Sequence, residues 1–206
     1  MRRLVDVAVS LLALVLLSPL LLLSMLAVRL ALGSPLIFRQ LRTGRNGRQF
    51  TIYKLRTMRA ERFPGEPDGD RTGRVGRWLR ATSLDELPQL VNVLLGHMSL
   101  VGPRPTLPDQ VRHYTARQHR RHEIRPGITG WAQVNGRNSL SWPERIELDI
   151  WYIDHRSLAV DLRIVGHTLL RLVRPSGLYG EGGVNPGYPV VELDPAAERR
   201  DRASDA

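Results

Sequence analysis

Residues 7–28 read VAVSLLALVLLSPLLLLSMLAV, a stretch of 22 residues with no charged side chain. Its Leu, Val and Ala residues would cover every side of a helix, whereas a helix packed on a soluble domain has a polar face. A helix of roughly 20 residues crosses the hydrocarbon core of a bilayer, so the stretch is long enough to enter one. We therefore expect residues 1–32 to form a membrane segment.

Three arrangements of this segment are open. A cleaved signal peptide is disfavoured, because the apolar part exceeds the usual length of roughly 7–15 residues and no small-x-small cleavage site precedes Arg29. A spanning anchor would be poorly oriented, since arginines flank the stretch at both ends. In the third arrangement the segment dips into the bilayer and returns, with both ends on the cytoplasmic face.

Pro19, near the middle of the stretch, predicts a kink. Proline has no backbone donor, so the carbonyl of Val15 would lose its helical partner. The hydroxyls of Ser18 and Ser24 could satisfy freed backbone groups where water is absent. Proline is tolerated in spanning helices, so the residues alone favour the re-entrant form only slightly.

The rest of the chain is strongly basic. Its 206 residues carry a formal net charge of +10, with Lys54 as the single lysine, and residues 39–80 contain twelve Lys or Arg against four Asp or Glu. Arginine holds phosphate with two hydrogen bonds, so phosphorylated substrates, anionic lipid and nucleic acid are all open as partners. A GC-rich genome would give the same bias. No cysteine is present, which excludes disulfides and thiolate chemistry.

Beyond residue 32 the pattern predicts a compact domain that is mainly helical with one small hairpin. The predicted elements are strands at 36–38 and 50–53 flanking a turn at 43–48, a loop at 63–76, and helices at 84–95, 142–153 and 160–173. The last helix is amphipathic, which suits a membrane surface or the domain core equally. After Pro175 the composition predicts a flexible tail.

Two loops carry candidate ligand-binding arginines. Pro103 and Pro105 flank Arg104 and would fix the direction in which it points. The loop at residues 125–131 precedes the group Asn135-Gly136-Arg137-Asn138, in which Arg137 is a candidate for substrate binding. Plain chain reversal explains this second loop equally well.

Two adjacent carboxylates, Asp85 and Glu86, stand at the predicted start of the helix at 84–95. Ser83 and Glu86 fit a capping box, so a purely structural role is one interpretation. The other interpretation starts from the basic segment that ends at Arg80. A carboxylate among arginines stays ionised at neutral pH, as a nucleophile or a Mg²⁺ ligand must be. Such a pair suits phosphoryl transfer, in which cations neutralise the charge of the phosphate oxygens.

Four ordered motifs resemble those of the bacterial sugar transferases, the monotopic polyprenyl-phosphate phosphoglycosyl transferases. The motifs are YKLRTM at 53–58, TSLDELPQL at 82–90, VGPRP at 101–105 and PGITGWAQV at 126–134. The resemblance extends from residue 1 to about residue 174. It implies transfer of a sugar phosphate from a UDP-sugar to undecaprenyl phosphate, with release of UMP and assistance from Mg²⁺.

The resemblance also implies roles for single residues. Asp85, the candidate Mg²⁺ ligand, matches the nucleophile of a covalent phosphosugar intermediate, and Glu86 completes the dyad. Three cations match substrate-site residues: Lys54 supports the dyad, Arg80 is associated with the polyprenyl phosphate, and Arg104 lies near bound phosphate. Ser18-Pro19 matches a Ser-Pro pair that breaks a re-entrant helix, so the third arrangement now leads.

The resulting prediction is an α+β, mainly helical enzyme with three parts. These are a re-entrant membrane helix at 1–32, a cytosolic catalytic domain at 33–178 with interfacial amphipathic helices, and a flexible tail at 179–206. We expect it on the cytoplasmic face of the bacterial inner membrane, with lipid, a UDP-sugar and undecaprenyl phosphate as partners and no nucleic acid. The alternative is a non-enzymatic, membrane-anchored module that binds anionic lipid or nucleic acid through its arginines.

Overall fold

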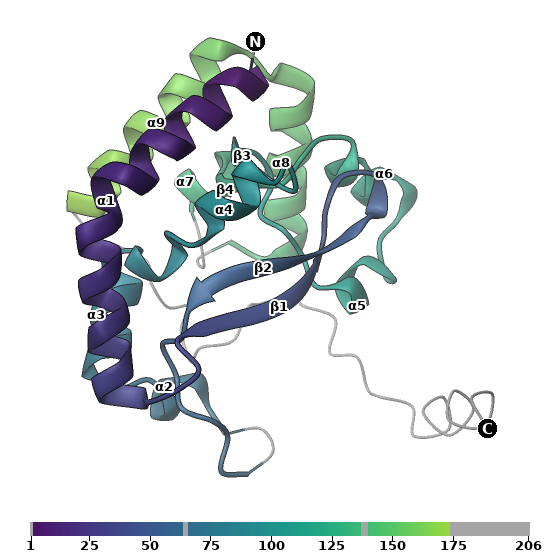
Figure 1. The fold of residues 1–206 in the computed structure, drawn as a ribbon. Helices are drawn as coiled ribbons and strands as arrows, with labels where there is room; N and C mark the ends of the chain where they lie inside the picture. The colour runs from purple at the N-terminus through teal and green to yellow at the C-terminus, as the bar shows by residue number, and fades with distance from the viewer. Residues whose placement is uncertain (1, 64–65, 137–139, 174–206) are drawn as a thin grey trace, which may run out of the picture.

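The chain begins with one long helix and continues into a domain of short helices and two small sheets (Figure 1). A computed structural model describes residues 2–63, 66–136 and 140–173. Helix α1 (Arg2–Leu32) is the one helix in these ranges whose length and composition suffice to cross a membrane. The predicted tail, 179–206, lies outside the described residues, so the boundary at 178 stays a prediction.

The elements after α1 are short and confirm the expected mixture of helices and a hairpin. They are β1 (Ile37–Thr43), η1 (Arg45–Gly47), β2 (Gln49–Leu55), α2 (Asp68–Arg71), α3 (Arg74–Ala81), η2 (Leu84–Glu86), α4 (Gln89–Leu94), β3 (Ser99–Val101), α5 (Pro108–Val111), α6 (Ala116–His119), η3 (Arg120–His122), β4 (Gly127–Thr129), α7 (Trp131–Val134), α8 (Trp142–His155) and α9 (Leu158–Val173).

The predicted hairpin is confirmed, with longer strands than expected. β1 and β2 are antiparallel, with Ile37 opposite Leu55 and Thr43 opposite Gln49. The chain reverses through η1, where Asn46 takes a left-handed backbone conformation (φ 56°). A second sheet pairs β3 and β4 in parallel. The loop that carries Arg104 begins where β3 ends, whereas β4 lies within the segment predicted as a loop at 125–131.

The kink predicted in α1 has the expected local chemistry. Pro19 lies inside the helix, and the hydroxyl of Ser18 donates to the carbonyl of Val15 at 2.8 Å. This carbonyl is the one that loses its backbone donor to proline. Figure 1 shows α1 bent about halfway along its length. Ser24 does not share this function, because its buried hydroxyl has no hydrogen-bond partner among the described residues.

The first turns of α1 are bound to the domain by polar contacts. Arg3 donates to the carbonyls of the last two residues of α4, at 2.5 and 2.9 Å. Asp6 accepts from the hydroxyl of Ser99 at 2.8 Å and from the following amide at 3.1 Å. Arg2 forms an ion pair with Asp161 of α9 at 3.3 Å. Polar side chains therefore hold the start of the apolar helix against α4, β3 and α9.

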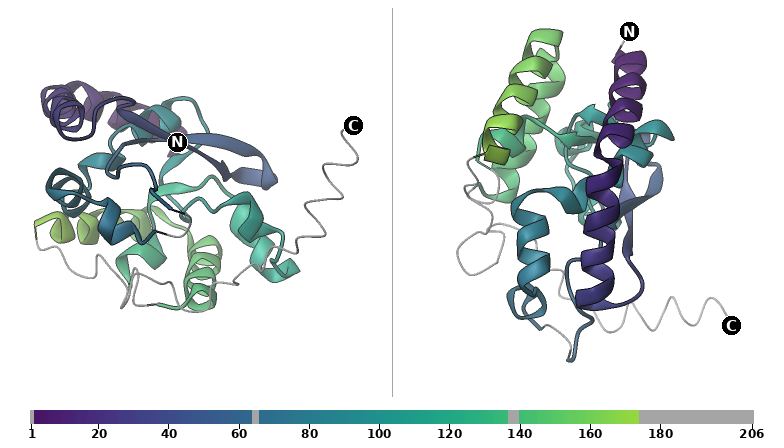
Figure 2. Two further views of the ribbon diagram at one scale, coloured as in Figure 1. Left: turned by 90° about the horizontal axis from the view of Figure 1, so that it is seen from below. Right: turned by 60° about the vertical axis from the view of Figure 1, so that its left-hand side comes forward.

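The last turns of α1 are bound to the same domain. Val28 is fully buried in a cluster with Leu55, Leu79 and Leu84, and Arg56 donates to the last carbonyl of the helix. Between the two attachments most leucines are exposed, including Leu16 at 67% and Leu22 at 65%. In Figure 2 (right), α1 runs lengthwise along the domain. Both ends of the apolar helix thus meet one domain, while its middle presents an apolar surface.

Two predictions about the domain need correction. The segment 63–76 is not all loop, because α2 and the first turn of α3 lie within it. Ion pairs of Arg71 with Glu61 and Asp68 help to order this segment despite its glycines and prolines. The helix predicted at 84–95 is divided into η2 and α4 at Pro88. The helices predicted at 142–153 and 160–173 are present as α8 and α9, each two residues longer at one end.

Candidate active site

The two carboxylates lie on a short 3-10 turn between α3 and α4. Ser83 takes a left-handed backbone conformation (φ 57°) and makes no side-chain cap. The capping box considered for Ser83 and Glu86 is therefore absent. Glu86 instead points toward cations from two other segments.

Glu86 is held by a lysine and an arginine at once. Its Oε1 lies 2.7 Å from Nζ of Lys54 on β2 and 3.1 Å from Nη2 of Arg104. Burial opposes the charged form of Glu86, but Lys54 and Arg104 outweigh it and hold the pKa of Glu86 far below its usual range. Burial also lowers the pKa of Lys54, although Glu86 acts against that shift. Glu86 is thus a fixed anion with both cations as its partners.

Asp85 has a different environment although it is the adjacent residue. It is 8% exposed and makes no hydrogen bond or ion pair with any described residue. Burial raises the pKa of Asp85 to about 6, and the negative charge of Glu86 adds to the rise. Lys54, Arg104 and Arg80 act in the opposite direction. Burial is the larger effect, but with a pKa of about 6 Asp85 is still mainly ionised at pH 7, as expected from the sequence.

Four successive residues at the end of β2 connect the site to the rest of the molecule. Lys54 binds Glu86, Leu55 enters the core against α1, and Arg56 binds the end of α1. Thr57 accepts a hydrogen bond from Nε of Arg80 at 3.0 Å. This run lies within the YKLRTM motif, so the motif links α1 to the dyad.

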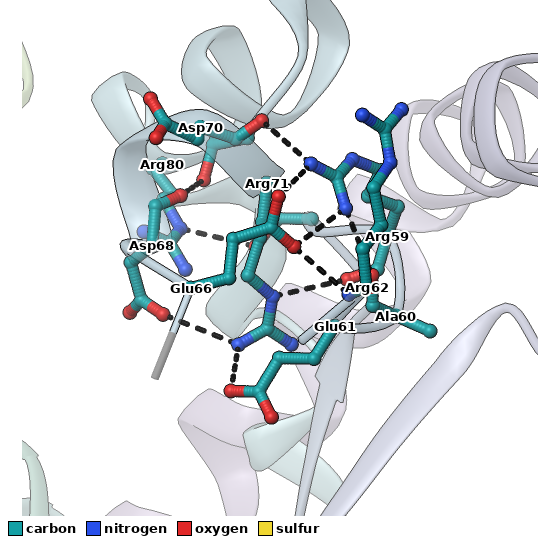
Figure 3. A network of polar contacts seen from close by, with 11 residues as sticks. Arg59, Ala60, Glu61, Arg62, Glu66, Asp68, Asp70, Arg71 and Arg80 are labelled. Atoms are coloured by element: carbon teal, nitrogen blue, oxygen red, sulfur yellow. Dashed lines mark hydrogen bonds and ion pairs between the residues drawn. The ribbon is translucent and has the colours of Figure 1, made fainter. Parts of the chain in front are cut away.

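Arg80 lies on α3, whose approach to β2 depends on a glycine. A Cβ on Gly76 would lie 2.0 Å from the carbonyl oxygen of Thr57. Nearby, Arg59 binds Glu66 with two hydrogen bonds (Figure 3). The hydrogen bond from Arg59 lowers the pKa of Glu66 to about 2. Arg80 is therefore placed by the close packing of Gly76 on the backbone of Thr57 and by its own hydrogen bond to the Thr57 hydroxyl.

The loop that carries Arg104 is braced on both sides. The carbonyl of Pro103 accepts from the amide of Gly127 at 2.9 Å, and the amide of Gly102 donates to Thr129 at 2.9 Å. The carbonyl of Pro105 accepts from Arg42 at 3.3 Å. The rigidity predicted from the two prolines is thus reinforced by hydrogen bonds, while the side chain of Arg104 stays 50% exposed.

Three residues that support the site were missed by sequence reasoning. Asn92, fully buried on α4, donates to the carbonyl of Thr51 at 2.7 Å and accepts from the amide of Tyr53 at 3.1 Å. Its signal was available, because it is a lone polar residue in the apolar run LVNVLL. Arg121 and Asp149 form a buried ion pair at 2.5 Å. That pair joins residues 28 positions apart, and no local sequence pattern indicates it.

For Mg²⁺, the dyad offers one unpaired carboxylate, that of Asp85. They contain no group of three or more His, Asp or Glu side chains that could hold a metal ion. Mg²⁺ is often bound by one or two carboxylates together with substrate phosphates. Asp85 fits that mode, because Glu86 is already occupied by two cations. Asp85 would therefore hold the ion jointly with a bound diphosphate.

The structure brings together Lys54, Asp85, Glu86 and Arg104, with Arg80 close enough for its charge to act on Asp85. Arg137 lies outside the described residues. A sequence model of the family described as "Bacterial sugar transferase" matches residues 1–175. The chain belongs to the bacterial sugar transferase family.

The relatives of this sugar transferase cover most of its length. It is 48% identical over 181 residues to the "Uncharacterized sugar transferase EpsL" of Bacillus subtilis (strain 168), covering 86% of this chain and 90% of the relative. It is 44% identical over 191 residues to the "UDP-glucose:undecaprenyl-phosphate glucose-1-phosphate transferase" of Caulobacter vibrioides, covering 86% of this chain and 72% of that relative. An Escherichia coli K12 protein with the same name is 40% identical, and the match covers 83% of this chain and 40% of the length of that relative.

Proposed function

We propose that this protein transfers a sugar phosphate from a UDP-sugar to undecaprenyl phosphate, with release of UMP. The observation that carries the proposal is the asymmetry of the dyad. Glu86 is bound by Lys54 and Arg104, whereas Asp85 is unpaired among the described residues. One carboxylate is fixed and the other is free to react. The names of the Caulobacter and Escherichia coli relatives support the classes of donor and acceptor.

In the proposed reaction Asp85 is the nucleophile. A carboxylate oxygen of Asp85 attacks the phosphorus that carries the sugar, and the bond to the uridine-bearing phosphate breaks, so that UMP leaves. An oxygen of undecaprenyl phosphate then attacks the same phosphorus, which releases Asp85 and forms the lipid diphosphate sugar. Burial supports attack by Asp85, because a carboxylate with a raised pKa is a stronger nucleophile than a solvated one.

The cations supply electrostatic stabilisation. Arg104, half-exposed and braced at its backbone, can contact phosphate oxygens while Lys54 keeps Glu86 neutralised. Arg80 lies on α3, the helix directly before the turn that carries the dyad, and would contact the acceptor phosphate. Mg²⁺, bound jointly by Asp85 and the diphosphate, would neutralise further charge on the phosphate oxygens.

We further propose that α1 enters the cytoplasmic leaflet and returns. A helix attached to one domain at both ends cannot cross the bilayer with that domain on one side, and the exposed leucines between its attachments need an apolar environment. The exposed apolar residues of α9, which include Leu158, Leu162 and Leu169, would lie at the membrane surface. This places Asp85 at the level of a lipid phosphate.

The test separates the two half-reactions. The purified protein is given each member of a UDP-sugar panel with Mg²⁺ but without acceptor, and we expect UMP in a single equivalent. Intact mass spectrometry should show one added sugar phosphate, which undecaprenyl phosphate then discharges. Asp85→Asn should give neither UMP nor adduct.

Two results would contradict parts of this proposal. Absence of UMP with every donor, with or without acceptor, would favour a binding module without enzymatic activity. UMP release that requires acceptor, with no adduct at any time, would exclude the covalent intermediate but keep the overall transfer.

A further inference from the structure

The pair formed by Arg121 of η3 and Asp149 of α8 lies behind the loop that carries Arg104. Both side chains are 3% exposed, and Nη2 of Arg121 lies 2.5 Å from Oδ2 of Asp149. The same Nη2 donates to the backbone carbonyl of Arg104 at 3.2 Å. One guanidinium nitrogen thus joins a buried carboxylate to the backbone of an active-site residue.

The guanidinium of Arg121 is held on further sides. Its Nη1 donates to the hydroxyl of Tyr114 at 2.6 Å, and its centre lies 5.4 Å from the ring centroid of Trp142. A planar guanidinium with fixed acceptors in two directions has little freedom to rotate. Its hydrogen bond to Arg104 is therefore made from a rigid support.

Stability alone does not explain such a pair. Removing two charges from water costs several kcal/mol per ion on general grounds, and apolar residues of similar volume often stabilise a fold equally well. What apolar residues cannot supply is a donor to the carbonyl of Arg104. We infer that Arg121 and Asp149 are positioning residues, which fix the backbone of Arg104 so that its side chain meets Glu86 and the substrate phosphate.

This inference rests on the proposed function, and it explains how Arg104 can be both fixed and available. The side chain of Arg104 is half-exposed and contacts Glu86 at 3.1 Å, so its outer atoms can reach a substrate. Its origin on the backbone is set by Arg121 and by the flanking prolines. A displacement of about 1 Å in a positioning group can lower a rate by about 10²-fold.

The test is a double-mutant cycle on kcat/KM for the UDP-sugar. Arg121→Lys keeps the charge opposite Asp149, but one ammonium cannot reproduce the planar fork that also binds Tyr114 and Arg104. We expect a loss of about 10- to 100-fold, mainly in kcat. In an Arg104→Ala background, itself impaired, Arg121→Lys should cause no further loss, because the two residues act through one group.

A matched control lies on neighbouring elements. Arg117 of α6 pairs with Glu147 of α8 at 2.7 Å, but both side chains are more than half exposed. Arg117→Lys should leave kcat and KM unchanged. Tyr114→Phe removes a single acceptor of Arg121, and it replaces Arg121→Lys in the cycle if the lysine variant has no cooperative thermal transition.

Each outcome decides one question. Losses that multiply in the double variant would overturn the positioning role, as would wild-type activity in Arg104→Ala. A wild-type protein that releases no UMP from any donor would overturn the proposed function instead. An active wild type with full coupling between residues 104 and 121 supports both.

Discussion

Nζ of Lys54 lies 2.7 Å from Oε1 of Glu86, so the only lysine of the chain binds the half of the dyad that does not attack in the proposed reaction. The lysine compensates a buried anion next to the nucleophile. Without it, the negative charge of Glu86 would repel both a diphosphate and the ionised form of Asp85.

Lys54→Met should therefore lower kcat by about 10²- to 10³-fold, a magnitude typical for loss of one stabilising group in a buried site. The side chain keeps its approximate volume, so the fold should survive. The measurement is UMP release under saturating substrates. Arg48→Met is the control, because Arg48 lies exposed on the same hairpin; an equal loss in both variants would exclude a specific function of Lys54.

Asp85→Asn should make the folded protein more stable while it removes activity. The pKa of Asp85 is about 6 in the folded state against an ordinary value of 3.8, so the folded state binds a proton more tightly than the unfolded state between these pH values. Stability of the wild type consequently falls as pH rises from 4 to above 6, by on the order of 2 kcal/mol. Asparagine at position 85 does not ionise, so the Asp85→Asn variant does not lose this stability as pH rises.

The test is the free energy of urea unfolding of wild type and Asp85→Asn, measured in one detergent at pH 4 and at pH 8 without Mg²⁺. The advantage of Asp85→Asn should be present at pH 8 and absent near pH 4. Asp109→Asn is the control, since its side chain is 71% exposed. A variant that is less stable than wild type at pH 8 would show that burial does not dominate at Asp85.

The pH dependence of activity should follow the same group. Protonated Asp85 cannot attack phosphorus, so kcat/KM should fall as pH decreases through about 6. Glu86 stays ionised throughout this range, because its pKa is held far below normal. A profile that is flat from pH 5 to pH 8 would contradict Asp85 as the group that must lose a proton.

Pro19→Ala should straighten α1 by restoring a donor to the carbonyl of Val15. A straight helix cannot keep both attachments to the domain, so we expect loss of activity. The chain has no cysteine, and single cysteines replacing Leu4 and Arg45 can report topology by labelling. In the parent both should react only from the cytoplasmic side; in Pro19→Ala a fraction of position 4 should react from the periplasm.

The control for the kink is Leu22→Ala, an exposed residue of the same helix, which should leave labelling and activity unchanged. Periplasmic labelling of position 4 in the parent would establish a simple spanning anchor and contradict the re-entrant form.

Asn92→Leu should destabilise the domain by about 2–3 kcal/mol, because two backbone groups of β2 would lose their partners in the interior. Asn92→Asp keeps the acceptor for Tyr53 but loses the donor to Thr51, so its effect should be intermediate. Chemical unfolding of both variants checks the order. Val91→Ala, an exposed residue on the same helix, should lie within about 0.5 kcal/mol of wild type.

Local patterns predicted much of this molecule. The apolar run predicted α1, Pro19 predicted its kink, and two short strand-like segments around the turn at 43–48 predicted the hairpin, because each of these features depends on neighbours in the chain. The motifs also identified Lys54, Asp85, Glu86, Arg80 and Arg104. The contacts show which of these residues lie together, and their roles are part of the proposed function.

What the sequence could not predict depends on distant partners. Glu86 fits a helix cap by its spacing from Ser83, and only the approach of Lys54 and Arg104 shows that it is used otherwise. The pairing of Arg121 with Asp149 has no local pattern at all. Burial of Asp85 likewise results from packing between segments, and it outweighs the opposite effect of the nearby cations on the pKa of Asp85.

The attachment of both ends of α1 to one domain also bears on how the protein reaches its membrane. In the proposed topology, neither Arg2 and Arg3 before the apolar stretch nor Arg29 after it has to pass through hydrocarbon during biogenesis. The charge asymmetry that orients a spanning helix is then unnecessary, and arginine at both flanks becomes an advantage. In that topology the folded domain can insert its helix into the cytoplasmic leaflet after synthesis.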